Sequence, residues 1–253
     1  MMQSLYMLQD SQWEEIKAII EPKVRKRKVS LQVIVSGIVY LLTNGCKWDS
    51  LPPDYGHYKL VWYYYNKWMV YGILEQLLYK LSVKVRTKKQ QRKVEPTLLI
   101  VDSQSVKTTA GTSEQTGYDA NKKVKGRKRH IAVDTQGNIM AAGVTAANVH
   151  DKVGALSLEE QVEDLDGVKK IMADGAYKGI PPFTAHGHIQ WEIVEKKAGN
   201  RFKVLPKRWI VERTLAWLSN FRRLSKDYEK SIAMSKAMIL MCSIIITLNK
   251  LIT

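Results

Sequence analysis

The stretch TLLIVDSQSV, residues 97–106, places four consecutive apolar side chains directly before an aspartate, Asp102. A short apolar run of this kind is typical of a strand buried at the centre of a sheet. The stretch VKKIMADGAY, residues 168–177, repeats the arrangement and places Asp174 after a second apolar run. We therefore expect two buried strands, each of which ends in a carboxylate.

The segments on either side of these strands extend the pattern. Residues 128–149 are expected to form two strands joined by a turn at 134–138, and residues 189–197 alternate as a short strand does. Residues 151–165 have a helical pattern, and a long helical region follows Pro206. This order of strands and helices predicts an α/β domain with a mixed sheet.

The first third of the chain has a different pattern, which predicts helices. Ser11 and Glu14 have the spacing of a capping box, Ser30 is placed to cap a second helix that ends near Gly45, and a third helix is expected from Tyr58. We predict a small all-α DNA-binding domain at 1–83, a basic linker at 84–96 that ends at a proline, and a catalytic domain at 97–253.

The charge of the chain indicates its partner. Of its 253 residues, 40 are Lys or Arg and 24 are Asp or Glu, for a formal net charge of +16. The bases cluster in four runs, within residues 23–28, 84–93, 122–129 and 203–223, and such patches are typical of nucleic-acid binding. The candidate DNA-binding residues are Arg25, Arg27, Lys122, Lys125, Arg127, Lys128, Arg129, Arg208, Arg213, Arg222 and Arg223.

Cysteine content and hydropathy exclude other classes of protein. The two cysteines, Cys46 and Cys242, are too few and too far apart in sequence for a disulfide framework or a cysteine zinc site. The first residues lack a signal-peptide pattern, and the longest apolar run, 238–248, is too short to span a bilayer, so we expect a buried helix there. A cytoplasmic protein without a membrane partner is predicted.

Three acidic residues are the candidates for catalysis. Ligands bind outside the strand ends of an α/β sheet, so Asp102 and Asp174 are expected to meet there, and Glu212 lies within the helical stretch RWIVERTLAWL. Converging carboxylates repel one another, and a divalent cation such as Mg²⁺ compensates this with oxygen coordination. The alternative is structural: the aspartates cap local turns, and Glu212 only pairs with Arg208 one helical turn earlier.

If the acids do converge, the chemistry expected is phosphodiester cleavage. Two bound metal ions clamp the scissile phosphate, activate the attacking water or DNA 3′-hydroxyl, and stabilise the leaving oxygen. The sequence has no GxSxG, P-loop or HExxH motif that favours a protein nucleophile or a different metal site.

The segments IVDSQSVK, ADGAYKG and RWIVERTLAWLSNFRRLSKDYE resemble the three acidic signatures of the DDE transposases of bacterial insertion sequences. The stretch 30–56 resembles the helical domain that precedes the catalytic core in one such family. The resemblance implies an RNase H-like fold, Mg²⁺-dependent (or Mn²⁺-dependent) cleavage at element ends by Asp102, Asp174 and Glu212 as metal ligands, and strand transfer into target DNA. It also implies terminal inverted repeats as substrate and a dimer on the DNA ends.

The region around Glu212 departs from the family pattern. Related transposases carry a Tyr-x2-Arg-x3-Glu-x6-Lys signature, in which Arg208 fills the arginine place but Leu205 and Ser219 replace the tyrosine and the lysine. Arg222 and Arg223 follow and could supply a cation. The short interval between Asp174 and Glu212 leaves no room for a large insertion domain.

Two other functions remain open at this stage. One is a catalytically inactive DNA-binding protein or repressor derived from such an element, which would use only residues 1–96. The other is an RNase H-like nuclease that hydrolyses DNA without joining it. Retention of all three acids within their motifs favours the transposase.

Overall fold

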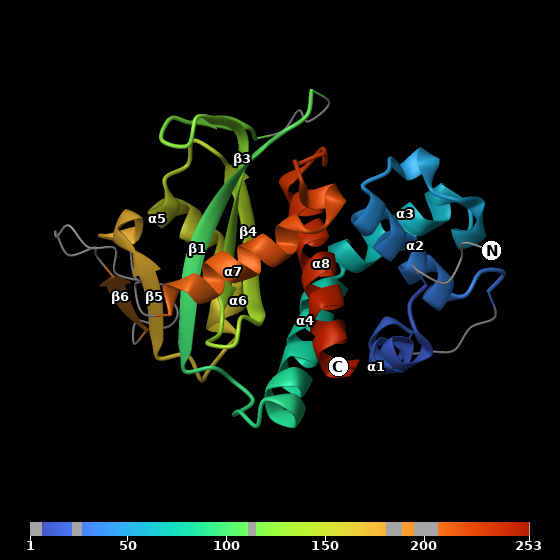
Figure 1. Cartoon of the computed structure of the whole chain (residues 1–253), viewed down its shortest axis with the longest axis horizontal. Coiled ribbons are helices and arrows are strands. Elements are labelled where there is room, and N and C mark those ends of the chain that lie inside the picture. Colours follow the sequence, from blue (N-terminus) through green and yellow to red (C-terminus); the bar gives the residue numbers. More distant parts are fainter. Residues whose placement is uncertain (1–6, 22–26, 111–114, 181–188, 195–206, 253) are drawn as a thin grey trace.

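The computed structural model describes residues 7–21, 27–110, 115–180, 189–194 and 207–252. A group of amino-terminal helices lies at one end of the molecule and a mixed sheet at the other, with α4 and α8 between them (Figure 1). The architecture confirms the expected fold class, a mixed sheet flanked by helices and preceded by an all-helical region.

The described part of the amino-terminal region forms the helices α1 (Asp10–Ile20), α2 (Leu31–Asn44), α3 (Tyr58–Val70) and α4 (Ile73–Lys84). Short 3₁₀ turns, Trp48–Ser50 and Pro53–Tyr55, connect α2 to α3. Ser30 caps α2 as predicted, because its side chain accepts a hydrogen bond from the Val33 N–H.

Two predictions for this region were wrong in detail. Helix α1 begins one residue before Ser11, and the reciprocal capping bonds join Gln9 to Gln12 instead. The long helix expected from Tyr58 divides into α3 and α4 at Gly72, whose φ of +64° is a left-handed conformation that glycine adopts without steric cost.

The sheet contains β1 (Leu98–Lys107), β2 (Gly117–Asp119), β3 (Val124–Val133), β4 (Ile139–Ala146), β5 (Lys170–Asp174) and β6 (Gln190–Val194). Its order is β2-β3-β1-β5-β6, and β4 also pairs with β3. Strands β1, β3 and β4 are antiparallel neighbours, whereas β1, β5 and β6 run parallel. The two central strands predicted from their apolar runs, β1 and β5, are indeed adjacent.

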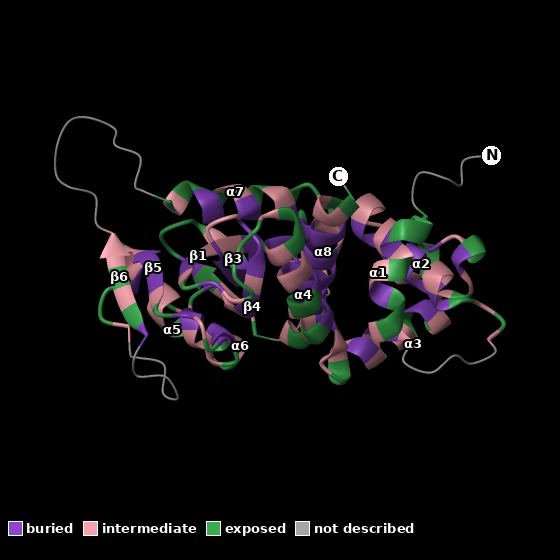
Figure 2. Ribbon diagram, turned by 90° about the horizontal axis from the view of Figure 1, so that it is seen from below, coloured by how far each residue is buried: buried purple, intermediate pink, exposed green. Residues whose placement is uncertain are grey.

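Helices cover both faces of the sheet (Figure 2). On one face, α5 (Asp151–Gly154), a 3₁₀ turn (Ala155–Leu158) and α6 (Glu159–Glu163) pack against alternate strand residues such as Leu99, Val101 and Ile171. On the other face, α7 (Arg208–Ser219) and α8 (Ile232–Ile252) cover Ile100, Ile131 and Val133. The alternation along β1 therefore separates two cores, as a period of two requires.

Helix α8 belongs to the larger core, which it shares with the amino-terminal helices. It packs against α4 and β4, and it also contacts α1, α2 and α3. The Tyr65 hydroxyl donates to the Met234 carbonyl at 2.7 Å, and the Gln12 amide donates to Asn249 Oδ1 at 3.0 Å. This helix has the length and hydropathy of a membrane span, but 61% of its most apolar window is buried inside the protein, which is the pattern of a core helix. The prediction of a buried helix is confirmed.

The segment predicted as a linker, 84–96, is partly structured. Residues Val85–Lys89 continue α4 as one π-helical turn, in which Val85 and Arg86 are buried. The Arg86 guanidinium pairs with buried Asp134 at the start of the turn between β3 and β4. One end of this segment is therefore fastened to the sheet.

Candidate active site

Asp102 lies within β1, not at its end as the sequence predicted. The parallel pairing of β1 with β5 stops at Ile100 and Met172, while the antiparallel pairing with β3 continues to Lys107. Asp102 therefore follows the point at which β1 loses its parallel neighbour. Its Oδ1 accepts a hydrogen bond from the Ser103 N–H at 2.7 Å, and its side chain is 15% exposed.

Asp174 is the last residue of β5, as predicted. It also caps the 3₁₀ turn Gly175–Tyr177, because its Oδ1 accepts a hydrogen bond from the Ala176 N–H at 2.9 Å. One oxygen of Asp174 thus caps a local turn, as the structural alternative predicted, while the other, Oδ2, points toward Arg208.

Glu212 comes from α7, which lies across β1 and β3 (Figure 1). Val211, Leu215 and Leu218 bury the sheet-facing side of this helix. The Glu212 side chain remains 54% exposed, one helical turn after Arg208.

The Arg208 guanidinium brings the three acids together. Its Nη2 lies 3.1 Å from Asp174 Oδ2 and 3.8 Å from Asp102 Oδ2, and its Nε lies 3.3 Å from Glu212 Oε1. The side chain of Arg208 is 23% exposed, so solvent screens these ion pairs only partly. Three carboxylates thus share one cation near the carboxyl-terminal end of β5.

The environment of Asp102 is unfavourable for a carboxylate. Burial raises its pKa to about 6, nearby Asp174 and Glu212 add to the increase, and the Ser103 N–H and Arg208 oppose it. A carboxyl group whose pKa is raised toward neutral pH by burial and by nearby negative charges is typical of a functional site.

The three carboxylates are chemically suited to bind a divalent metal ion. All three side chains offer hard oxygen ligands, which Mg²⁺ and Mn²⁺ prefer. Their combined negative charge is larger than the single positive charge of the guanidinium. In the described part of the chain, no three possible ligands lie close enough to hold one ion in the present conformation. Arg208 stands between the acids, so its guanidinium has to turn aside before they can share a metal.

A polar network behind Asp102 was not predicted from the sequence. Ser103 Oγ donates to Asp151 Oδ1 at 2.7 Å, and Lys128 Nζ lies 2.9 Å from the same oxygen. Tyr177, almost fully buried, stacks on Trp191, and burial together with the nearby Asp102 and Asp151 carboxylates raises its pKa. The sequence signal for this network is limited to the adjacent polar pair His150-Asp151.

Four of the predicted DNA-binding cations are buried and bonded within the protein. Arg127 pairs with Asp227 at 3.3 Å, Arg129 donates to the Leu224 carbonyl at 2.8 Å, Lys128 pairs with Asp151, and Arg223 pairs with Glu229 at 2.7 Å. Their charged groups are occupied inside the fold, so they are not placed to meet DNA phosphates.

The remaining candidates differ in their surroundings. Lys122, Lys125 and Arg222 are exposed. Arg213 is stacked between Trp209 and Trp217, 4.6 Å from each ring, and Arg27 pairs with Glu21 and donates to the Tyr64 hydroxyl. Arg25 lies outside the described residues.

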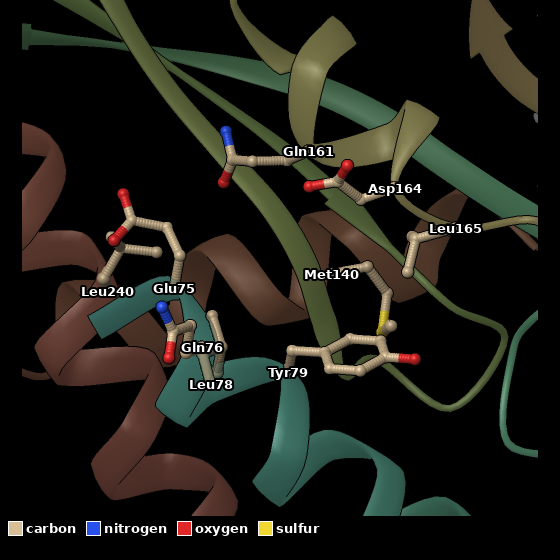
Figure 3. A pocket seen from close by; sticks show the side chains of 9 residues that line it. All are labelled: Glu75, Gln76, Leu78, Tyr79, Met140, Gln161, Asp164, Leu165 and Leu240. Atoms are coloured by element: carbon tan, nitrogen blue, oxygen red, sulfur yellow. The ribbon is translucent and has the colours of Figure 1, made fainter. Parts of the chain in front are cut away.

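A separate cavity of about 290 Å³ lies between α4, α6, β4 and α8 (Figure 3). Its lining includes Glu75, Tyr79, Met140, Asp164 and Leu240. None of the three carboxylates of the candidate site contributes to it. Glu75 is paired there with Lys236 at 3.0 Å.

Comparison with known proteins identifies the family. Residues 93–248 match the family model described as a transposase DDE domain, and residues 8–78 match a putative transposase of the IS4/5 family. A putative transposase for insertion sequence element IS402 from Burkholderia cepacia is 31% identical over 42% of this chain and 54% of its own length. An uncharacterized protein, y4sN, from Sinorhizobium fredii (strain NBRC 101917 / NGR234) is 24% identical over 30% of this chain and 62% of its own.

The chain therefore spans little more than half the length of these curated relatives. No solved structure matches. The DDE-domain match covers more than half of the chain and includes Asp102, Asp174 and Glu212. The chain belongs to the DDE transposases of bacterial insertion sequences.

Proposed function

We propose that this transposase cleaves DNA at the ends of an insertion sequence and joins the freed 3′-hydroxyl to target DNA. The observation that supports the proposal is the convergence of Asp102, Asp174 and Glu212 on the Arg208 guanidinium. These side chains come from β1, β5 and α7, so the fold and not local sequence brings them together. A cluster whose negative charge exceeds its positive charge is suited to divalent cations.

Asp102, Asp174 and Glu212 would hold Mg²⁺ or Mn²⁺, and DDE transposases as a family generally use divalent metals. When bound, the metal ions supply Lewis-acid activation of the attacking oxygen and stabilisation of the leaving oxygen. Arg208, released from the acids, would present its planar donors to a non-bridging phosphate oxygen, for which a guanidinium is well suited. The Ser103–Asp151 hydrogen bond would hold the strand that carries Asp102.

The other assignments of the sequence stay proposals. Residues 1–83 would bind the terminal inverted repeats, 84–96 would connect the two parts, and 97–253 would carry out catalysis. The exposed cations Lys122, Lys125 and Arg222, together with Arg25, Arg27, Arg208 and Arg213, are the candidates for phosphate contacts. We expect a dimer on paired DNA ends, acting in the cytoplasm on the nucleoid.

The experiment that tests the function uses purified full chain, Mg²⁺ and a labelled duplex that carries the end of its own element with flanking DNA. We expect a nick at the element boundary that EDTA abolishes and that Asp102→Asn, Asp174→Asn and Glu212→Gln each abolish. Glu160→Gln, an exposed acid on α6, is the matched control and should cut normally.

The outcomes separate three functions. Boundary nicks followed by strand transfer into a target plasmid support the transposase. Nicks without transfer, under conditions in which an active transposase joins DNA, favour a hydrolytic nuclease. Binding to the end duplex without any nick identifies an inactive DNA-binding derivative.

A further inference from the structure

A basic groove lies at the carboxyl-terminal end of β1. This end of the strand lies away from α4 (Figure 1). The groove has a volume of about 550 Å³ and is lined by Lys107, Lys123, Lys125, Thr108 and Tyr118, with two further threonines and an alanine. We call it the lysine groove. No carboxylate is among the described residues that line it.

The wall of the lysine groove formed by β1 is fixed by buried contacts. Thr108 forms a parallel bridge with Asp227, and the Asp227 N–H donates to the Lys107 carbonyl at 2.8 Å. The Asp227 carboxylate accepts a hydrogen bond from Ser235 Oγ at 2.6 Å and pairs with buried Arg127 at 3.3 Å. The strand end that carries Lys107 and Thr108 is therefore held in one position.

The opposite wall is a fixed turn. Asp119 Oδ1 accepts hydrogen bonds from the N–H groups of Asn121 and Lys122, each at 3.0 Å, and Asp119 Oδ2 accepts one from Ser105 Oγ at 2.6 Å. Among the described residues, the ion pair of Asp119 is with Lys128 at 3.8 Å and not with a lysine of the groove. A Cβ at position 126 would lie 2.0 Å from the Val106 carbonyl oxygen, so glycine is required for the two walls to approach.

We propose that the lysine groove binds the sugar–phosphate backbone of duplex DNA to one side of the scissile phosphate, an inference that rests on the proposed function. Lysine ammonium groups neutralise phosphates, and threonine and tyrosine hydroxyls donate to phosphate oxygens. These are the side chains that line the groove. A polyanion is the partner that this charge and these hydroxyl groups complement.

The position of the groove sets the length of DNA involved. Lys107 follows Asp102 by five residues on the same strand, which corresponds to about 17 Å at roughly 3.4 Å per residue. That distance corresponds to about five base pairs of duplex, at about 3.4 Å per pair. A duplex that runs along β1 with its scissile phosphate at Asp102 would therefore reach the strand end at the lysine groove about half a helical turn away.

The test compares wild type with a variant that carries Lys107→Gln, Lys123→Asn and Lys125→Gln. Asparagine is chosen at position 123 because the φ of Lys123 is +53°, a conformation that asparagine tolerates. The probe is a fluorescent random-sequence duplex of about 40 base pairs, titrated between about 50 and 200 mM salt. If each lysine neutralises one phosphate, the slope of log affinity against log salt should fall by about 3, and the affinity at low salt by about tenfold or more.

The control variant carries Lys169→Gln, Lys170→Gln and Lys236→Gln, three lysines that lie outside the lysine groove and outside the segments assigned to DNA binding. It has the same net charge as the groove variant, so long-range attraction alone would affect both equally. An equal loss in both variants, or an unchanged slope in the groove variant, overturns the proposal. Thermal unfolding of both variants checks that neither has lost its fold.

A second measurement uses end duplexes shortened in turn on each side of the cleavage site. The groove variant should cut more slowly than wild type on the full-length duplex at subsaturating DNA. This difference should disappear once the duplex ends within about five base pairs on the side that reaches the groove. A protein that cuts no end duplex refutes the proposed function, whereas equal cutting by wild type and groove variant at every length refutes only the groove.

Discussion

Arg208 Nη2 lies 3.1 Å from Asp174 Oδ2, so the first residue of α7 is joined to the last residue of β5. The same guanidinium is within 4 Å of Asp102 and Glu212. This arginine is a cation that offsets the repulsion between the acids. A divalent metal that bound here would compete with Arg208 for the same oxygens, and this competition would be measurable.

Replacing Arg208 with glutamine should therefore change the response to Mg²⁺. Without metal, the variant should melt at a lower temperature than wild type because the three carboxylates lose their shared cation. Saturating Mg²⁺ should raise the melting temperature of the variant more than that of wild type, by roughly 2–4 °C for each additional kcal/mol of binding. Differential scanning fluorimetry with EDTA and with Mg²⁺ measures both values.

Arg222→Gln is the control for this experiment, because Arg222 is exposed and has no ion pair with the three acids among the described residues. Its melting temperature and its Mg²⁺ response should match wild type. If Arg208→Gln and wild type respond identically to Mg²⁺, the arginine and the metal do not compete.

The raised pKa of Asp102 predicts opposite pH trends for stability and activity. Its folded value of about 6 exceeds the ordinary 3.8, so the folded protein holds this proton more tightly than the unfolded chain. The resulting stability is complete below about pH 4 and is lost as pH rises through about 6, by at most about 3 kcal/mol. Urea unfolding at pH 5 and pH 7.5 should show about half of this loss in wild type and none of it in Asp102→Asn, because the other half occurs below pH 5.

Cleavage should increase over the same interval, because a metal ligand has to be ionised. At limiting Mg²⁺, single-turnover cleavage should rise as pH passes about 6, and more Mg²⁺ should move the midpoint to lower pH, since metal and proton compete for the carboxyl. A midpoint that does not move with Mg²⁺ would assign the titration to another group.

The contact between Ser103 and Asp151 should affect catalysis through the position of Asp102. Partners that orient a metal ligand typically contribute about 10- to 100-fold to activity, and we expect a loss of that order for Asp151→Asn and for Ser103→Ala. Affinity for DNA should be unchanged. If the two residues act through their shared hydrogen bond, the double variant should lose little more than either single variant. Fully additive losses would show that the two residues act independently of each other.

Arg127 and Arg129 should determine stability and not DNA affinity. Both guanidinium groups are buried, and Arg127 bonds to the Glu229, Lys230 and Ser231 carbonyls in addition to Asp227. Arg127→Met removes a buried cation that pairs with Asp227, and breaking a buried ion pair typically costs about 3–5 kcal/mol. Urea unfolding of Arg127→Met, with Lys125→Gln as an exposed control in the same strand, measures the difference. A normal unfolding midpoint for Arg127→Met would contradict the buried arrangement.

The apolar runs before Asp102 and Asp174 were sufficient to predict the two central strands, because a strand buried on both faces appears in the sequence as consecutive apolar residues. The convergence of both acids followed from the same pattern. The burial of the basic run KGRKR, residues 125–129, could not be predicted in this way. It depends on Asp227 and Glu229, which lie about a hundred residues later in the chain. Alternation along β3 points Arg127 and Arg129 to the side where these partners lie, and a local count of charges cannot detect that.

The contacts of Arg208 with Asp102 and Asp174 could not be predicted from the local sequence either. Its spacing of four from Glu212 predicted one contact, and the structure adds Asp102 and Asp174 from two strands. The break at Gly72 was missed for a different reason: a single glycine inside an apolar helical pattern is tolerated in many helices, and only its left-handed φ shows that the helix ends there.

Helix α8 has a consequence for how the protein is made. Its residues complete the core in which α1, α2, α3 and α4 are packed, yet they are synthesised about 150 residues after α4. The amino-terminal helices therefore reach their final packing only after α8 has been synthesised, which differs from the usual order in which amino-terminal domains fold first. A product of early termination would expose the apolar surfaces that α8 covers and would be a target for proteolysis. Only molecules translated through α8 can then complete the packing of the amino-terminal helices.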